Sequence, residues 1–195
     1  FAAALAGDHA ALLRKVEADG LAGYGACAIG PLPDFDPGAA LAGDRDHRFV
    51  AAPDWGGQVF QTGPLARRWT ETAALRERFG SGLLAHLQAR LDELETLVPA
   101  MRRLAQGLEH DGGVLVPEGG GTGLGVVEAA RGRLYHRIEI ERGRIARYQI
   151  LAPTEWNFHP RGPLAEGLKG ADPGPARLLV AALDPCVACE VATHA

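Results

Sequence analysis

The stretch GLLAHLQARLDELETLVPAMRRLAQGLEH, residues 82–110, carries the clearest periodic pattern in this 195-residue chain. Its apolar residues alternate spacings of three and four, which keeps their side chains on one side of an α-helix. The seam consists of Leu84, Leu87, Leu91, Leu94, Val98, Met101, Ala105 and Leu108. The pattern predicts a long helix over residues 82–110 whose seam belongs to a helical core.

Shorter patterns flank this helix on both sides. Helices are predicted over residues from about 3 to 19 and over 65–79, the first with an apolar face of Leu5, Leu12, Leu13 and Val16. Alternation around turn residues predicts one β-hairpin in 47–63 and a second in 133–151. In the second hairpin, Leu134, His136, Ile138 and Ile140 form the expected packed face. The predicted fold class is mainly α (α+β): a single-domain helical bundle, residues 1–195, with a long central helix and small β-hairpins.

Composition excludes several classes of function. The chain has a formal net charge of -4, so it lacks the basic surface that nucleic acid requires. No apolar run reaches the length of a membrane span, and membrane insertion is not expected. Three cysteines make no disulfide framework, which predicts free thiols or metal ligands in a reducing cytoplasm. Because the first residue is Phe1, we expect a fragment that lacks an N-terminal portion.

Two of the cysteines stand in the segment DPCVACEV, residues 184–191. Asp184 and Pro185 have the chemistry of a helix N-terminus, so Cys186 and Cys189 are predicted in the first helical turn with their sulfurs on one side. Spacing alone leaves three hypotheses open: a redox couple, half of a structural zinc site, or half of a larger metal centre.

Four motifs in a fixed order resemble those of the large subunit of [NiFe] hydrogenases. DPCVAC resembles that family's C-terminal DPCxxC signature. EAARGRLYH (128–136), GRIARYQILAPTEWNFHPR (143–161) and QTGPLARRW (61–69) resemble three further family stretches. The resemblance covers most of residues 55–189.

The resemblance implies roles for five residues. In the family the C-terminal cysteines bind the nickel–iron centre, which assigns metal binding to Cys186 and Cys189. The family's arginine and its hydroxyl residue contact the cyanide ligands of the iron, which assigns cofactor binding to Arg131 and Thr154, with Pro153 beside Thr154. A buried anionic diatomic ligand requires donors of these kinds.

Two departures from the family pattern separate this chain from a catalytic subunit. The family's second cysteine pair, in an R-x-C-G-x-C motif, does not occur in residues 1–195. Ala192 stands where the family has a histidine that helps to hold magnesium and marks the maturation protease's cut. The tail with Ala192 resembles the large-subunit-like accessory proteins of the HupK type, which are hydrogenase expression/formation proteins.

The first hypothesis is therefore a non-catalytic scaffold for the iron–cyanide–carbonyl unit in hydrogenase maturation. Its expected partners are maturation chaperones and hydrogenase subunits. The alternative is the C-terminal part of a catalytic large subunit that oxidises H2 at a nickel–iron centre. A third possibility is a homologue that binds protein partners and no metal.

Overall fold

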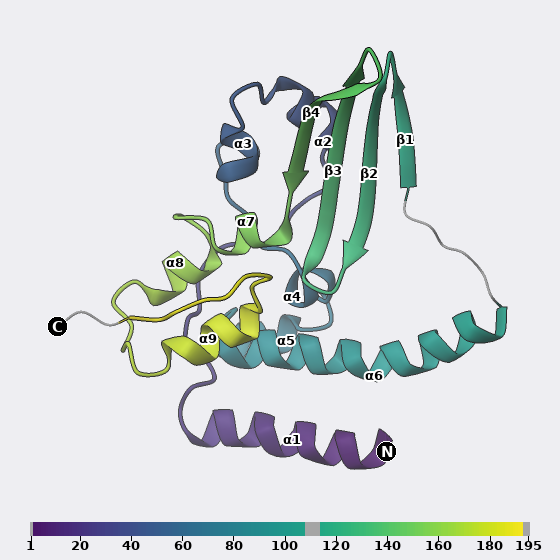
Figure 1. Cartoon of the computed structure of the whole chain (residues 1–195). Coiled ribbons are helices and arrows are strands. Elements are labelled where there is room, and N and C mark those ends of the chain that lie inside the picture. Colours follow the sequence, from purple (N-terminus) through teal and green to yellow (C-terminus); the bar gives the residue numbers. More distant parts are fainter. Residues whose placement is uncertain (1, 108–113, 193–195) are drawn as a thin grey trace.

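The computed structural model describes residues 2–107 and 114–192 and combines a layer of helices with one antiparallel sheet (Figure 1). The helices are α1 (Ala2–Ala18), α2 (Pro37–Gly43), α3 (Arg48–Ala51), α4 (Pro64–Arg67), α5 (Ala73–Phe79), α6 (Leu83–Gly107), α7 (Pro153–Asn157), α8 (Pro163–Leu168) and α9 (Ala176–Leu183). The strands are β1 (Val114–Gly119), β2 (Thr122–Ala129), β3 (Gly132–Glu141) and β4 (Arg144–Leu151), in the order β1-β2-β3-β4.

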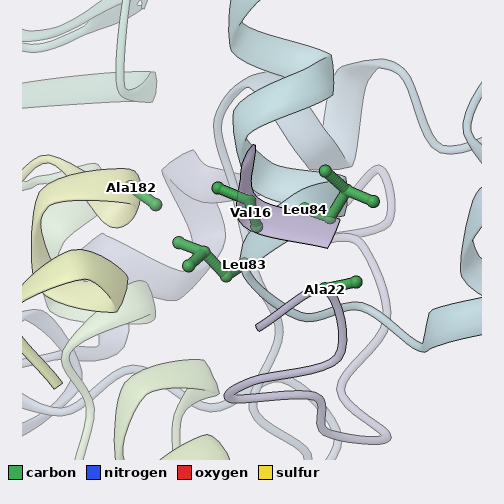
Figure 2. Packing of buried hydrophobic residues seen from close by; sticks show 5 residues of the cluster. All are labelled: Val16, Ala22, Leu83, Leu84 and Ala182. Atoms are coloured by element: carbon green, nitrogen blue, oxygen red, sulfur yellow. The ribbon is translucent and has the colours of Figure 1, made fainter. Parts of the chain in front are cut away.

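The long helix α6 is the centre of the helical layer, as the seam predicted. Helices α1, α4, α5 and α9 all pack on it. Its first half is buried through Leu83, Leu84 and Leu91. Leu83 and Leu84 form one core cluster with Val16 of α1, Ala22 and Ala182 of α9 (Figure 2). Burying such side chains is the main favourable term in folding.

The second half of α6 does not join this core. Leu94, Val98 and Met101 are exposed, and Met101 keeps 65% of its surface accessible. The prediction that the whole seam lies in a core was therefore wrong beyond Leu91. Leu108 lies outside the described residues, as does the side chain of Leu5, and in α1 Leu12 is exposed while Leu13 packs against the core.

The predicted second hairpin is confirmed as β3 and β4, but its faces are reversed. Tyr135 pairs with Leu151, and both are buried against Trp156 of α7 and Leu41 of α2. The residues expected to pack, among them Ile140, lie on the other face, where Ile140 is 44% exposed. His136 is there too, only partly buried and stacked on Tyr148.

Polar partners explain why the polar face of β3 is turned inward. Arg137 is buried and pairs with Glu139, which also pairs with Arg147 of β4. The side chain of Gln149 donates to the carbonyl oxygen of Asp44, 3.1 Å away. Buried polar groups are tolerated when they are hydrogen-bonded or paired, and here the partners lie within the sheet and, for Gln149, at the distant residue Asp44.

The predicted first hairpin was wrong. Residues 48–51 form helix α3, and the turn that follows contains a single bridge between Trp55 and Gln58. The chain then reaches Gln61, which forms an isolated parallel bridge with Pro31. The helix predicted over residues 65–79 is confirmed only in part, because turn residues 68–72 separate α4 from α5.

Candidate metal centre

The cysteine tail follows helix α9 without forming a helix of its own. Asp184 is the C-cap of α9, with φ 50° and ψ 70° in the left-handed region, and its N–H donates to Val180. Residues 185–192 contain no helix, and both Cys186 and Cys189 are exposed. The predicted helical turn around the cysteines was wrong, because Asp184 ends one helix instead of beginning another.

All three cysteines of the chain are free thiols. Cys27 is partly buried and lies within 4.0 Å of the Ser81 hydroxyl. Cys186 and Cys189 are therefore accessible from solvent, and neither forms a disulfide with Cys27.

Two arginines from distant parts of the sequence donate hydrogen bonds to the C-terminal end of α9. Arg131, in the turn between β2 and β3, donates from Nε to the main-chain oxygen of Asp184 at 2.7 Å. Arg90 of α6 donates to the Asp184 carboxylate at 2.9 Å and to the main-chain oxygen of Ala182 at 3.2 Å. Cations at a helix C-terminus satisfy its unpaired carbonyl groups and offset the partial negative charge there. The root of the cysteine tail is fixed in this way.

The carboxylate of Asp184 stays ionised because of the same arginines. Burial raises its pKa, but the hydrogen bond and charge of Arg90, with those of Arg131, outweigh that effect and hold the pKa below its ordinary value. Asp184 therefore remains a negatively charged anchor between two positive side chains.

The turn that carries Arg131 packs directly on Thr62 and Gly63. A Cβ on Gly63, which has φ 97°, would lie 2.7 Å from the main-chain oxygen of Arg131. Gly132 is equally constrained, because a Cβ there would collide with the Thr62 hydroxyl. Only glycine allows this close approach of two backbones.

Helix α7 is attached to the same segment. The Asn157 side chain accepts from the Thr62 N–H at 3.0 Å and donates to the Thr62 carbonyl at 3.1 Å. All of these groups are buried, so the pair of hydrogen bonds has no competition from water. Segment 62–63 thus joins α7, which contains Pro153 and Thr154, to the Arg131 turn.

The predicted site residue Thr154 lies at the start of helix α7. It is the second residue of α7, after the buried Pro153. Its hydroxyl oxygen is buried and has no hydrogen-bond partner in the part of the chain that the structure describes. A buried hydroxyl without a partner costs about 1–3 kcal/mol, which a bound acceptor or donor would recover.

The four motifs therefore meet in one region although they are distant in sequence. The structure brings Arg131 to Asp184, two residues before Cys186. Thr154 and Arg131 are connected indirectly, through Asn157 of α7 and Thr62 beside the turn. Among the described residues, the Thr154 hydroxyl itself makes no hydrogen bond.

Sequence reasoning missed several residues that build this region. Arg67 and Asn157 stand inside two of the quoted motifs. Their place in those motifs could have identified them as candidates, but no role was assigned to them. Arg90 lies on the polar side of the long helix, where nothing in the local pattern distinguishes it from a solvated charge. Only the fold identifies its partner.

The donor set decides which kinds of metal group fit. Among residues 2–107 and 114–192, no three His, Cys, Asp or Glu side chains lie close enough together to hold a metal ion. Residues 1–195 contain three cysteines, of which Cys186 and Cys189 are the exposed pair. The tail offers two exposed soft donors, a set that fits one thiophilic metal whose other ligands come from elsewhere.

The fold is that of part of the large subunit of [NiFeSe] hydrogenases. A structure of the H2-activated enzyme from Dm. baculatum matches 84% of this chain and 39% of its own, with a TM-score of 0.52 and 26% identity. A variant of the enzyme from Desulfovibrio vulgaris Hildenborough matches 69% of this chain with the same TM-score and 25% identity.

The chain belongs to the nickel-dependent hydrogenase family, whose sequence model matches residues 83–194. A "Hydrogenase expression/formation protein HupK" from Rhizobium leguminosarum bv. viciae is 39% identical over 93% of this chain and 51% of its own length. A protein of the same description from Bradyrhizobium diazoefficiens is 41% identical over 79% of this chain and 44% of its own length. The chain thus spans about half the length of these relatives.

Proposed function

We propose that this chain is a large-subunit-like accessory protein of hydrogenase maturation, a scaffold that carries the iron–cyanide–carbonyl unit as cargo. One observation carries the proposal: an exposed pair of free thiols is fixed at its root to the arginine that would receive an anionic ligand. The names of the relatives, hydrogenase expression/formation proteins, support it.

The chemistry of the tail suits a cargo that must arrive and leave. Cys186 and Cys189 are accessible, so a donor and an acceptor protein can both reach a metal bound there. A low-spin iron that brings its own cyanide and carbonyl ligands needs few protein donors, and two thiolates are of the soft kind that it accepts. Maturation chaperones and hydrogenase subunits are the partners that this role requires, in a cytoplasm that keeps the thiols reduced.

The surroundings of the tail can receive the cyanides. The hydrogen bonds from Arg131 to Asp184 use its Nε and Nη2 groups, and a guanidinium has further N–H donors. The unpaired hydroxyl of Thr154, next to Pro153, is the second donor that the motif assigns. We propose Cys186 and Cys189 as iron ligands and Arg131, Thr154 and Pro153 as contacts of the diatomic ligands.

Residues 1–195 hold one of the two cysteine pairs on which the family builds its nickel–iron centre, so a complete centre would need donors from outside these residues. The alternative remains the C-terminal part of an H2-oxidising large subunit, since a "Coenzyme F420 hydrogenase subunit alpha" from Methanosarcina barkeri is 34% identical over 74% of this chain.

Infrared spectroscopy tests the proposal on protein purified from cells that make the diatomic ligands. We expect bands of iron-bound cyanide and carbonyl, little nickel and no hydrogen uptake. Changing Cys186 and Cys189 together to Ser should abolish the bands, because a hard hydroxyl replaces a soft thiolate, whereas Cys27→Ser is the matched control and should keep them. Arg131→Ala should weaken retention of the unit without abolishing it. Stoichiometric nickel with hydrogen uptake would establish the enzyme instead.

A further inference from the structure

Arg67, the last residue of α4, donates hydrogen bonds from all of its guanidinium N–H groups. Nε and Nη2 bind the two carboxylate oxygens of Glu93 in α6, each at 2.7 Å. Nη1 binds the Glu128 carboxylate at 2.6 Å. Nη1 also donates to the main-chain oxygen of Ala129 at 3.2 Å, and Nη2 also donates to the main-chain oxygen of Ala130 at 2.9 Å. Five donors thus have five acceptors, which is the full capacity of an arginine.

The two main-chain oxygens belong to the residues directly before Arg131. Arg67 therefore binds the backbone of the turn, and Gly63, four residues earlier in the chain, packs closely against the same turn at Arg131. Among the described hydrogen bonds, Arg67 is the side chain that donates to the carbonyl groups of Ala129 and Ala130, and it is itself bound to α6 through Glu93. Arg67 therefore connects the turn to α6.

Helix α6 also holds the other half of the site. Glu93 fixes Arg67, and Arg90, one helical turn earlier, fixes Asp184 at the root of the cysteine tail. The position of Arg131 relative to the tail is therefore set by its direct hydrogen bonds to Asp184 and by two anchors on α6, one of which acts through Arg67.

We propose that Arg67 is the positioning residue for Arg131. This inference rests on the proposed function, in which Arg131 receives a ligand of the metal unit. Charge matters here as well as geometry. Burial lowers the pKa of Arg67, but Glu93 and Glu128 outweigh it, so the group stays charged and paired. Lysine keeps the charge but cannot reproduce the planar fork that reaches two carboxylates and two carbonyl groups.

The variant Arg67→Lys tests the inference, and Arg68→Lys is its matched control. Arg68 is the next residue and also contacts α6, through the Asp92 carbonyl at 3.2 Å, but none of its described hydrogen bonds reaches the turn. In metal-free protein, hydrogen exchange of the amides in 128–132 should become about tenfold faster in Arg67→Lys and stay unchanged in Arg68→Lys.

In protein carrying the iron unit, Arg67→Lys should shift the cyanide bands in the same direction as Arg131→Ala, and the double variant should show no further shift. Should Arg67→Lys fail to fold, Glu93→Gln weakens the same anchor and should give a smaller shift of the same sign. A lower melting temperature with unchanged bands and unchanged exchange in 128–132 overturns the inference. Absence of bands from the wild-type protein would refute the proposed function alone, because the exchange experiment does not need the cargo.

Discussion

His86 lies on the buried face of α6, where burial and the neighbouring charge of Arg90 lower the pKa of its imidazole to about 4. An imidazole in the unfolded chain has its ordinary pKa of 6.5. On acidification the unfolded state therefore takes up the proton first, and stability that is present above about pH 6.5 is lost as the pH falls toward 4.

Urea unfolding at about pH 7 and about pH 5 tests this expectation. The wild-type protein should lose about 2 kcal/mol between the two values, and His86→Gln should lose markedly less. His47→Gln, at an exposed position, is the control and should behave as wild type. An equal loss in wild type and His86→Gln contradicts the expectation. Asp184 contributes in a separate and more acidic range, because its pKa lies below 3.8.

At the scale of elements, the sheet has one face in the core and one apolar face open to solvent. Leu151 is fully buried, whereas Ile145 on the same strand is 64% exposed. Ile150 and Val127 are also exposed on the outer face. Exposed apolar surfaces of this kind are typical of places where proteins meet other chains.

The two faces make opposite predictions for substitutions in β4. Ile145→Thr keeps the branched side chain of a strand residue and should change the free energy of unfolding by less than about 0.5 kcal/mol. Leu151→Ala leaves a cavity beside Trp156 and should cost about 2–5 kcal/mol. Denaturant unfolding of both variants decides the orientation, and a larger cost for Ile145→Thr than for Leu151→Ala would mean that the faces are assigned the wrong way round.

At the scale of the whole molecule, the candidate site exists only because long-range contacts bring four segments together. Arg131 and Asp184 are 53 residues apart, and Thr62 and Asn157 are 95 apart. No helix among the described residues is long and apolar enough to cross a membrane. The assembled site depends on a folded core, so destabilising α6 should also release the cysteine tail from Arg131.

The alanine at position 192 leads to a prediction about processing of the whole chain. The family's histidine at this position marks the cut of the maturation protease. The methyl group of Ala192 can neither contact the metal nor be recognised by the protease in the way that the histidine is. Protein made together with the full maturation machinery should therefore keep its C-terminal residues, as measured by intact mass. A product that ends at Ala192 would show that cleavage does not need the histidine.

The sequence by itself determined the positions of α1, α6 and the β3–β4 hairpin, because these depend on spacings between near neighbours in the chain. It also determined the soft thiol donors and the motifs that indicate the family. Tertiary structure alone decided that the polar side of β3 faces inward, that the second half of α6 stays exposed, and that Asp184 ends a helix. The physical reason is that these outcomes depend on partners far away in sequence: Asp44 for Gln149, and Arg90 and Arg131 for Asp184. A local pattern shows which groups need a partner, and only the folded chain shows which partner they find.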